Sequence, residues 1–246
     1  MPDRMPYTLI LFDLDGTLAE TAPEIQDAVN DTLAECQLPL AGPEQVQRWI
    51  GHGTRALLLH ALAHASGQSE EQVRQWPELP AITAAFDRHY AARSGTRARL
   101  YPHARQSLCA LRACGVKLAV VTNKEARHTQ RVLHALGLLP LLDRVISGDS
   151  LPSKKPDPAG VLACMREFGA SPARTLFVGD SSIDAATARN AGIAIWLLPH
   201  GYNMGEPVHA CAPDRVLHHG FASFMQALQL CSGQGSPLSH PMPTTP

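Results

Sequence analysis

The pattern of apolar and polar positions divides the chain into segments of two kinds. An apolar run at residues 8–12, Thr-Leu-Ile-Leu-Phe, predicts a strand buried on both faces of a parallel sheet. Residues 21–93 then show helical spacing and no alternating strand pattern, which predicts a small helical domain inserted after the first strand. The predicted helices of this insertion cover residues 23–36, 54–66 and 81–93, with one more opened by a capping box at Ser69.

After the insertion, strand and helix patterns alternate to the end of the last predicted helix. Strands are predicted at 117–122, 144–147, 175–178 and 194–198, and helices at 102–113, 124–136, 158–168, 183–191 and 221–230. This alternation favours an α/β fold with a Rossmann-like parallel sheet core covered by helices on both faces. The expected division is a core of residues 1–18 plus 95–232, a helical domain of 19–94, and a disordered Pro- and Ser-rich tail of 233–246.

Composition and charge exclude several classes of protein. The chain is 45% hydrophobic with a formal net charge of −1, so it has a sizeable core and no basic surface for nucleic acid. Its apolar runs are short and interrupted, which argues against a membrane span and a secretory signal, and we expect a cytoplasmic protein. The six cysteines form no C-x-x-C pair, so zinc or a disulfide framework is not expected. The sequence leaves the oligomeric state open.

Two carboxylates follow the first predicted strand directly, in the sequence Asp-Leu-Asp-Gly-Thr at 13–17. Ligands of open α/β sheets bind outside the carboxyl ends of the strands, so both side chains lie where a substrate would sit. An aspartate there can act as a nucleophile, which suggests Asp13, and a second carboxylate can serve as acid and base, which suggests Asp15. Gly16 allows the tight turn between them and the next segment.

Two further strand ends carry groups suited to a phosphate. Thr122 and Asn123 follow the strand at 117–122, where a hydroxyl, an amide and free N–H groups of a helix start can bind an anion. Lys155 stands directly before a proline and a helix, where it could neutralise phosphate and position the nucleophile. We interpret its neighbour Lys154 as a surface residue.

A fourth strand end carries a pair of aspartates that indicates a site for a divalent cation. Asp180 and Asp184 follow the strand at 175–178 and are four residues apart, so one helical turn would bring the two carboxylates to one face. Like charges there are unfavourable unless a cation lies between them. Mg²⁺ prefers a few carboxylates together with phosphate oxygens and water, which fits this set.

These four motifs, in this order at four successive strand ends, resemble the haloacid dehalogenase superfamily of phosphohydrolases. The resemblance covers residues 7–230, and the helical insertion looks like the cap of its C1-type members. It implies that Asp13 is the nucleophile, that Asp15 is the general acid and base, and that Lys155 stabilises a phospho-aspartate. It also implies that Thr122 and Asn123 bind the phosphoryl group. The implied Mg²⁺ ligands are Asp13, the backbone carbonyl of Asp15, Asp180 and, in support, Asp184.

A closer resemblance suggests the substrate. Residues 49–53, Trp-Ile-Gly-His-Gly, are similar to the W-[VI]-G-N-G loop of bacterial phosphoglycolate phosphatases, with His52 in place of the usual asparagine. Residues 201–206 and 147–152 are similar to two other stretches of those enzymes. The resemblance implies hydrolysis of a small phosphorylated metabolite, 2-phosphoglycolate. Candidates for binding its carboxylate are His52, Arg55 and Arg48, because arginine recognises carboxylates well.

Five alternatives share parts of this pattern. A haloacid dehalogenase has no use for a second aspartate as acid for the leaving group, and Asp15 is present. A phosphonate-cleaving relative needs a lysine in the insertion, and residues 19–94 contain none. A phosphatase of sugar or amino-sugar phosphates and a phosphomutase both share the core motifs and stay open. A non-catalytic binding protein on this fold should have lost one of the motif residues, and all are present.

Overall fold

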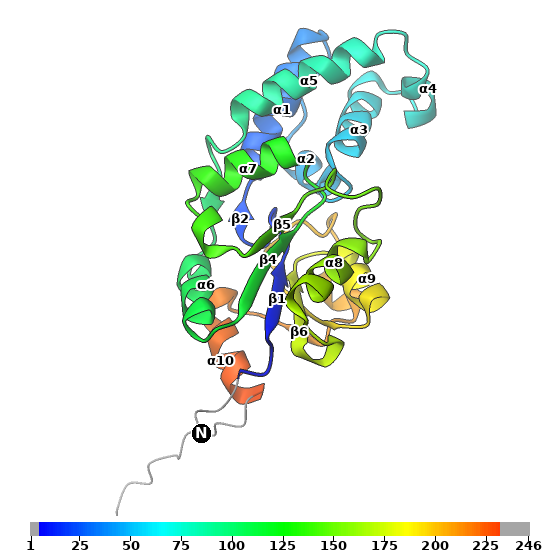
Figure 1. Cartoon of the computed structure of the whole chain (residues 1–246). Coiled ribbons are helices and arrows are strands. Elements are labelled where there is room, and N and C mark those ends of the chain that lie inside the picture. Colours follow the sequence, from blue (N-terminus) through cyan, green and yellow to red (C-terminus); the bar gives the residue numbers. More distant parts are fainter. Residues whose placement is uncertain (1–4, 232–246) are drawn as a thin grey trace, which may run out of the picture.

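A six-stranded parallel sheet forms the centre of the computed structural model, which describes residues 5–231 (Figure 1). The strand order is β5-β4-β1-β6-β7-β8. The strands are β1 (Leu9–Phe12), β4 (Lys117–Val121), β5 (Arg144–Ile146), β6 (Thr175–Gly179), β7 (Ala194–Leu197) and β8 (Arg215–Val216). β8 was not predicted, since two residues carry no periodicity. The predicted disordered tail at 233–246 lies outside the described residues.

Helices cover both faces of this sheet, which confirms the predicted α/β fold. Successive strand residues point to opposite faces, so Ile10 and Phe12 belong to one apolar cluster and Leu9 and Leu11 to another. The first cluster packs beneath α6 (Ala104–Ala113), α7 (Ala126–Ala135) and α10 (Phe221–Cys231). The second packs beneath α8 (Ala159–Phe168) and α9 (Ser182–Ala191). Three short 3-10 turns, Leu139–Leu141, Pro172–Arg174 and Val208–Cys211, join these elements.

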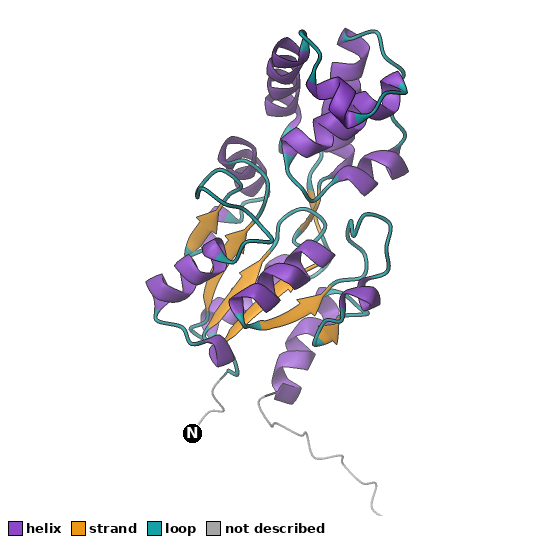
Figure 2. Cartoon of the chain, turned by 90° about the vertical axis from the view of Figure 1, so that its right-hand side faces the viewer, coloured by secondary structure: helices purple, strands orange, loops and turns teal. Residues whose placement is uncertain are grey.

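Five helices form a separate layer beyond one end of the sheet (Figure 2). They are α1 (Ala22–Glu35), α2 (Pro43–Trp49), α3 (Thr54–Ser66), α4 (Glu70–Arg74) and α5 (Leu79–Arg93). This helical layer has its own apolar cluster, which includes Val29, Leu58 and Phe86. α2 was not predicted because Val46 is the one residue of the seven that is buried, too few for a helical apolar stripe.

The chain enters and leaves the helical layer side by side. β2 (Ala19–Glu20) pairs antiparallel with β3 (Arg99–Leu100), a two-residue pairing too short to predict from sequence. Nearby, the buried Oε2 of Glu24 accepts main-chain hydrogen bonds from Gly95 (2.9 Å), Arg97 (3.2 Å) and Ala98 (2.9 Å). These bonds fasten the start of α1 to the segment that returns to the sheet.

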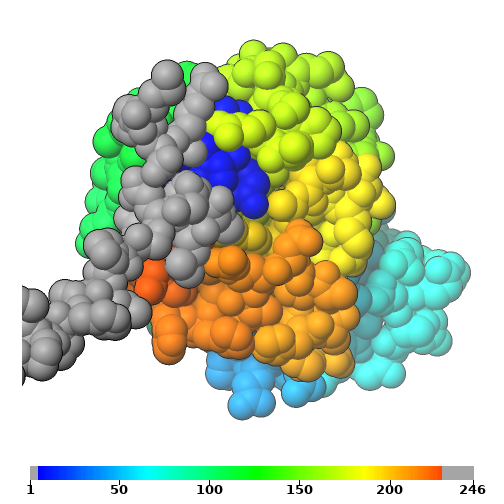
Figure 3. All heavy atoms as spheres, turned by 90° about the horizontal axis from the view of Figure 1, so that it is seen from below, coloured from blue at the N-terminus to red at the C-terminus, as the bar shows by residue number. Residues whose placement is uncertain are grey.

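The opposite end of the molecule carries the amino ends of the strands. Seen from that side, core elements fill the view and the cyan segment of the helical layer projects past their outline (Figure 3). The cation Lys117 begins β4 at this end, far along the strand from the helical layer. Among residues 5–231, no helix is both long and apolar enough to cross a membrane.

Candidate active site

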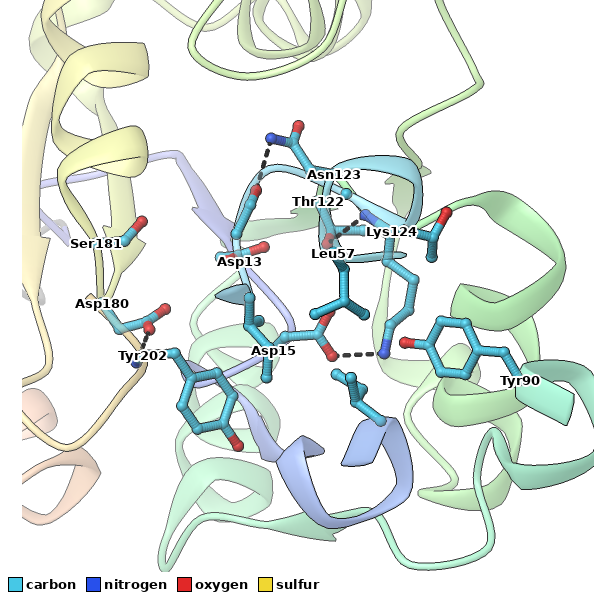
Figure 4. Close-up of a pocket in the computed structure, with 15 residues that line it drawn as sticks. Asp13, Asp15, Leu57, Tyr90, Thr122, Asn123, Lys124, Asp180, Ser181 and Tyr202 are labelled. Carbon is cyan, nitrogen blue, oxygen red and sulfur yellow. Dashed lines mark hydrogen bonds and ion pairs between the residues drawn. The ribbon is translucent and has the colours of Figure 1, made fainter. Parts of the chain in front are cut away.

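The strand ends that carry the predicted motifs meet at one edge of the sheet. Phe12, the last residue of β1, is in register with Val120 of β4 and Val178 of β6. The residues that follow therefore emerge together under the helical layer, where a cavity lies (Figure 4). Its lining residues are Asp13, Asp15, Ile25, Ile50, Gly51, Gly53, Thr54, Leu57, Tyr90, Thr122, Asn123, Lys124, Asp180, Ser181 and Tyr202.

Three buried carboxylates gather at this edge. Asp13, Asp180 and Asp184 each offer one oxygen, and these oxygens lie within 4.8 Å of one another. Burial raises the pKa of Asp13 to about 7, with Lys155 lowering it and the charge of Asp184 raising it again. Burial and the charge of Asp184 also raise the pKa of Asp180 well above its usual value. The site thus concentrates negative charge that a divalent cation would stabilise.

The predicted lysine, Lys155, lies between two of these carboxylates. Its ammonium is 2.8 Å from Oδ1 of Asp13 and 2.7 Å from Oδ1 of Asp184. Burial lowers the pKa of Lys155, but the attraction of the two carboxylates outweighs burial and holds the pKa above its usual value, so the side chain is charged. The exposed Lys154 instead donates to the main-chain oxygen of His52 at 2.7 Å.

Asp184 fixes the loop that carries Asp180. Its Oδ2 accepts from the main-chain N–H of Asp180 (3.1 Å), the N–H of Ser181 (3.1 Å) and the Ser181 hydroxyl (2.7 Å). Ser181 is the N-cap of α9 and accepts in return from the Asp184 N–H. The proximity of the two aspartates therefore comes from a capping loop and not from a helical turn, because Asp180 precedes the helix.

The side chain of Asp180 is held by residues from two other segments. Oδ1 accepts from the Thr17 hydroxyl at 2.6 Å, and Oδ2 accepts from the main-chain N–H of Tyr202 at 2.6 Å. Two glycines allow this approach: a Cβ on Gly16 or Gly201 would lie 2.4 Å or 2.1 Å from Oδ2 of Asp180. Gly16 also has φ +81°, a conformation that favours glycine. The stretch at 201–206 thus contributes to the site through its backbone.

Thr122 and Asn123 both lie at the cavity, but their groups have different partners. The side-chain amide of Asn123 donates to the main-chain oxygen of Gly51 (2.9 Å) and of Lys155 (3.0 Å). It therefore joins the helical layer to the loop that carries Lys155. The Thr122 hydroxyl accepts from the Lys124 N–H at 3.3 Å and keeps its own proton for another acceptor.

The structure brings into the cavity one residue that sequence analysis missed, Lys124. Its ammonium lies 2.6 Å from Oδ1 of Asp15 and 5.4 Å from the ring centroid of Tyr90, which comes from α5 (Figure 4). Burial lowers the pKa of Lys124, but Asp15 and Tyr90 outweigh burial and hold it above the usual value. Sequence analysis placed Lys124 on a helix; α7 begins only at Ala126, which leaves Lys124 in the loop. The scarcity of lysine could have drawn attention to Lys124, since the chain has only four lysines in all.

The predicted carboxylate-binding residues lie elsewhere. The side chains of His52 and Arg55 are exposed and neither lines the cavity, although the backbone of Gly51 and Gly53 beside them does. Arg55 faces a second depression between α3, α5 and the start of α7. Arg48 is exposed and packs near Gly205. The geometry therefore gives no support to these three as substrate contacts.

A sequence profile of haloacid dehalogenase-like hydrolases matches residues 10–197, which include every motif at the sheet edge. The chain belongs to this family. It is 40% identical over 224 residues to a phosphoglycolate phosphatase of Haemophilus influenzae, covering 91% of this chain and 98% of that protein. It is also 39% identical over 214 residues to phosphoglycolate phosphatase 1 of Pseudomonas aeruginosa, covering 87% and 77%.

A solved structure shows the same architecture. The crystal structure of a predicted phosphoglycolate phosphatase from Haemophilus somnus 129PT superposes with a TM-score of 0.84 and is 36% identical, covering 91% of this chain and 99% of that one. The resemblance of the four motifs to haloacid dehalogenase phosphohydrolases is confirmed. The chain is therefore a hydrolase of this family, and the polar groups of its four motifs gather at the carboxyl edge of the sheet.

Proposed function

We propose that this chain hydrolyses 2-phosphoglycolate to glycolate and phosphate, with Mg²⁺, through a phosphoryl group carried on Asp13. The observation that carries the proposal is the meeting of Asp13, Asp15 and Lys155 at one cavity, in a chain 40% identical to a phosphoglycolate phosphatase. Phosphoryl transfer needs positioning and neutralisation of charge, and this set of residues supplies both.

The residues present fit a magnesium ion. Three buried carboxylates face one another with Lys155 as their cation, so negative charge is in excess. Burial first, and the neighbouring carboxylates in addition, raise the pKa values of Asp13 and Asp180. Asp13, Asp180 and the backbone carbonyl of Asp15 would hold the ion. Asp184 has donors on both oxygens and would act through the loop of Asp180. When bound, the ion neutralises phosphate charge and aligns it with Asp13.

In the first step a carboxylate oxygen of Asp13 forms a bond to phosphorus, and the bond from phosphorus to the glycolate oxygen breaks. Asp15 gives its proton to that oxygen as glycolate leaves. Lys155, already on Asp13 Oδ1, stabilises the charge on the phosphoryl oxygens together with the Thr122 hydroxyl and the main-chain N–H of Asn123. Water then attacks phosphorus while Asp15 takes its proton, which restores both aspartates.

The helical layer acts in this proposal as a cap. Its residues Gly51 and Tyr90 contact Asn123 and Lys124 at the sheet edge. Ile25, Ile50 and Leu57 give the cavity an apolar roof. Such a roof excludes water during the first step, and opening it releases the product.

The test is phosphate release across a panel of substrates, with and without Mg²⁺. The panel contains 2-phosphoglycolate, hexose and amino-sugar 6-phosphates, β-glucose 1-phosphate, nucleoside monophosphates and an aryl phosphate. The proposal predicts the highest kcat/KM for 2-phosphoglycolate and no release after chelation of the metal. A higher kcat/KM for a sugar phosphate would contradict the substrate and leave the mechanism standing.

A further inference from the structure

We propose that Lys124 binds the carboxylate of the leaving group and thereby selects phosphomonoesters of small hydroxy acids. The inference rests on the proposed function and replaces His52, Arg55 and Arg48 as the carboxylate-binding groups. It starts from the charge of the cavity. Among the described residues that line it, Lys124 is the sole basic side chain.

The apolar roof makes a cation necessary for such a substrate. Ile25, Ile50 and Leu57 line the cavity with apolar side chains. A carboxylate closed in beside these side chains loses its water and needs an opposite charge to offset the cost. Lys155 does not serve, because it does not line the cavity and its ammonium lies between Asp13 and Asp184.

The bonds around Asp15 place Lys124 beside the leaving group. Oδ1 of Asp15 accepts from Lys124 and from the Thr21 hydroxyl, both at 2.6 Å. The other oxygen, Oδ2, has no hydrogen bond from the described residues. It is therefore the oxygen that would give a proton to the leaving oxygen in the proposed mechanism. In 2-phosphoglycolate one methylene carbon separates that oxygen from the carboxylate. Lys124 and the leaving oxygen are thus both neighbours of one carboxyl group.

Lys124 has donors to spare for a second carboxylate. An ammonium has three N–H groups, and Asp15 uses one. The Tyr90 hydroxyl points toward the same nitrogen from the helical layer (Figure 4). The lysine is 4% exposed, so its ion pairs form away from bulk water and orientation is fixed by its neighbours. The Lys124 ammonium would therefore bind a substrate carboxylate and Asp15 at the same time when the cavity is closed.

The test compares an acid with its neutral analogue in wild type and Lys124→Met. The substrates are 2-phosphoglycolate and 2-phosphoglycolamide, which differ in the charge of the leaving group. Wild type should prefer the acid, and Lys124→Met should lower that preference in kcat/KM by about 10- to 150-fold, the value of a charge-assisted hydrogen bond. Lys124→Arg should keep most of the preference, because it keeps the charge.

The possible results distinguish carboxylate binding by Lys124 from carboxylate binding by Arg55 and from a different substrate. Equal losses on both substrates would show that Lys124 only supports Asp15, and would overturn the inference. Loss of the preference in Arg55→Met and not in Lys124→Met would overturn it too. A wild type without any preference for the acid would contradict the proposed substrate before any variant is compared. Lys117→Met, at the exposed far end of β4, is the matched control, and Lys124→Gln repeats the comparison if the methionine variant does not fold.

Discussion

Oδ1 of Asp13 lies 2.8 Å from the ammonium of Lys155, and both side chains are buried. The lysine reaches Asp13 from the loop before α8, while Asp13 follows β1, so the fold itself creates the pair. The cation favours the ionised form of Asp13, whose pKa burial alone would raise further. An ionised Asp13 is what a nucleophile at this edge requires.

Lys155→Met should therefore affect both rate and stability. We expect kcat for 2-phosphoglycolate to fall at least about a hundredfold, because a fixed positive charge on the reacting oxygens is lost. The free energy of unfolding in chelator should fall by about 3 kcal/mol, since Asp13 and Asp184 lose their buried partner. Urea denaturation and initial rates measure the two effects. An unchanged kcat would exclude Lys155 from the reaction.

Asp15→Asn should slow turnover and leave substrate binding nearly intact. The asparagine keeps the shape of the side chain and removes its proton chemistry, which is worth about 10²- to 10⁴-fold in rate. The loss should be smaller for an aryl phosphate, whose leaving group needs less protonation. A Brønsted comparison of aryl and alkyl phosphates measures this difference. Equal losses for every leaving group would speak against a general acid at Asp15.

His128 should make stability depend on pH. It stacks on Tyr90 with ring centroids 4.1 Å apart, and burial, followed by the charge of Arg127, lowers its pKa from 6.5 to about 4. Between these values the unfolded chain binds the proton and the folded chain does not. The stability from neutral His128 is thus full above about pH 6.5 and lost toward pH 4, by up to about 3 kcal/mol.

The measurement for His128 is urea denaturation of wild type and His128→Phe from pH 7 to pH 4.5. Phenylalanine keeps a ring against Tyr90 and cannot take up a proton. Wild type should lose more stability than the variant as the pH falls, so their difference isolates this residue from other titrating groups. Parallel stability curves would show that His128 contributes nothing to the pH dependence.

The strand-end motifs were predictable because two simple regularities coincide there. Apolar runs marked the strands, and parallel strands end at one edge, so Asp13, Thr122 and Asp180 had to meet. Lys155 followed from its position at the next loop and from the resemblance to a known family. The predicted helix at 54–66 and the capping box at Ser69 also agree with the structure, since both depend on local sequence.

The features that the sequence did not predict depend on tertiary contacts. The sequence pattern predicts a helix from residue 124, whereas α7 begins two residues later, at Ala126. This difference leaves Lys124 in the loop, where its side chain lines the cavity. His52 and Arg55 were chosen for their charge, yet the backbone of their loop, and not their side chains, contacts the cavity. α2, β2 and β3 are too short or too polar for periodicity to detect.

The most direct test of the account is the kcat/KM of Asp13→Asn for 2-phosphoglycolate in saturating Mg²⁺, beside wild type purified in the same way. The substitution keeps the volume of the side chain and replaces the carboxylate by a neutral amide, which is a poor nucleophile. The account predicts a loss of at least about a thousandfold, to the level of the blank. A folded Asp13→Asn protein that hydrolyses 2-phosphoglycolate within about tenfold of the wild-type rate would contradict the central claim.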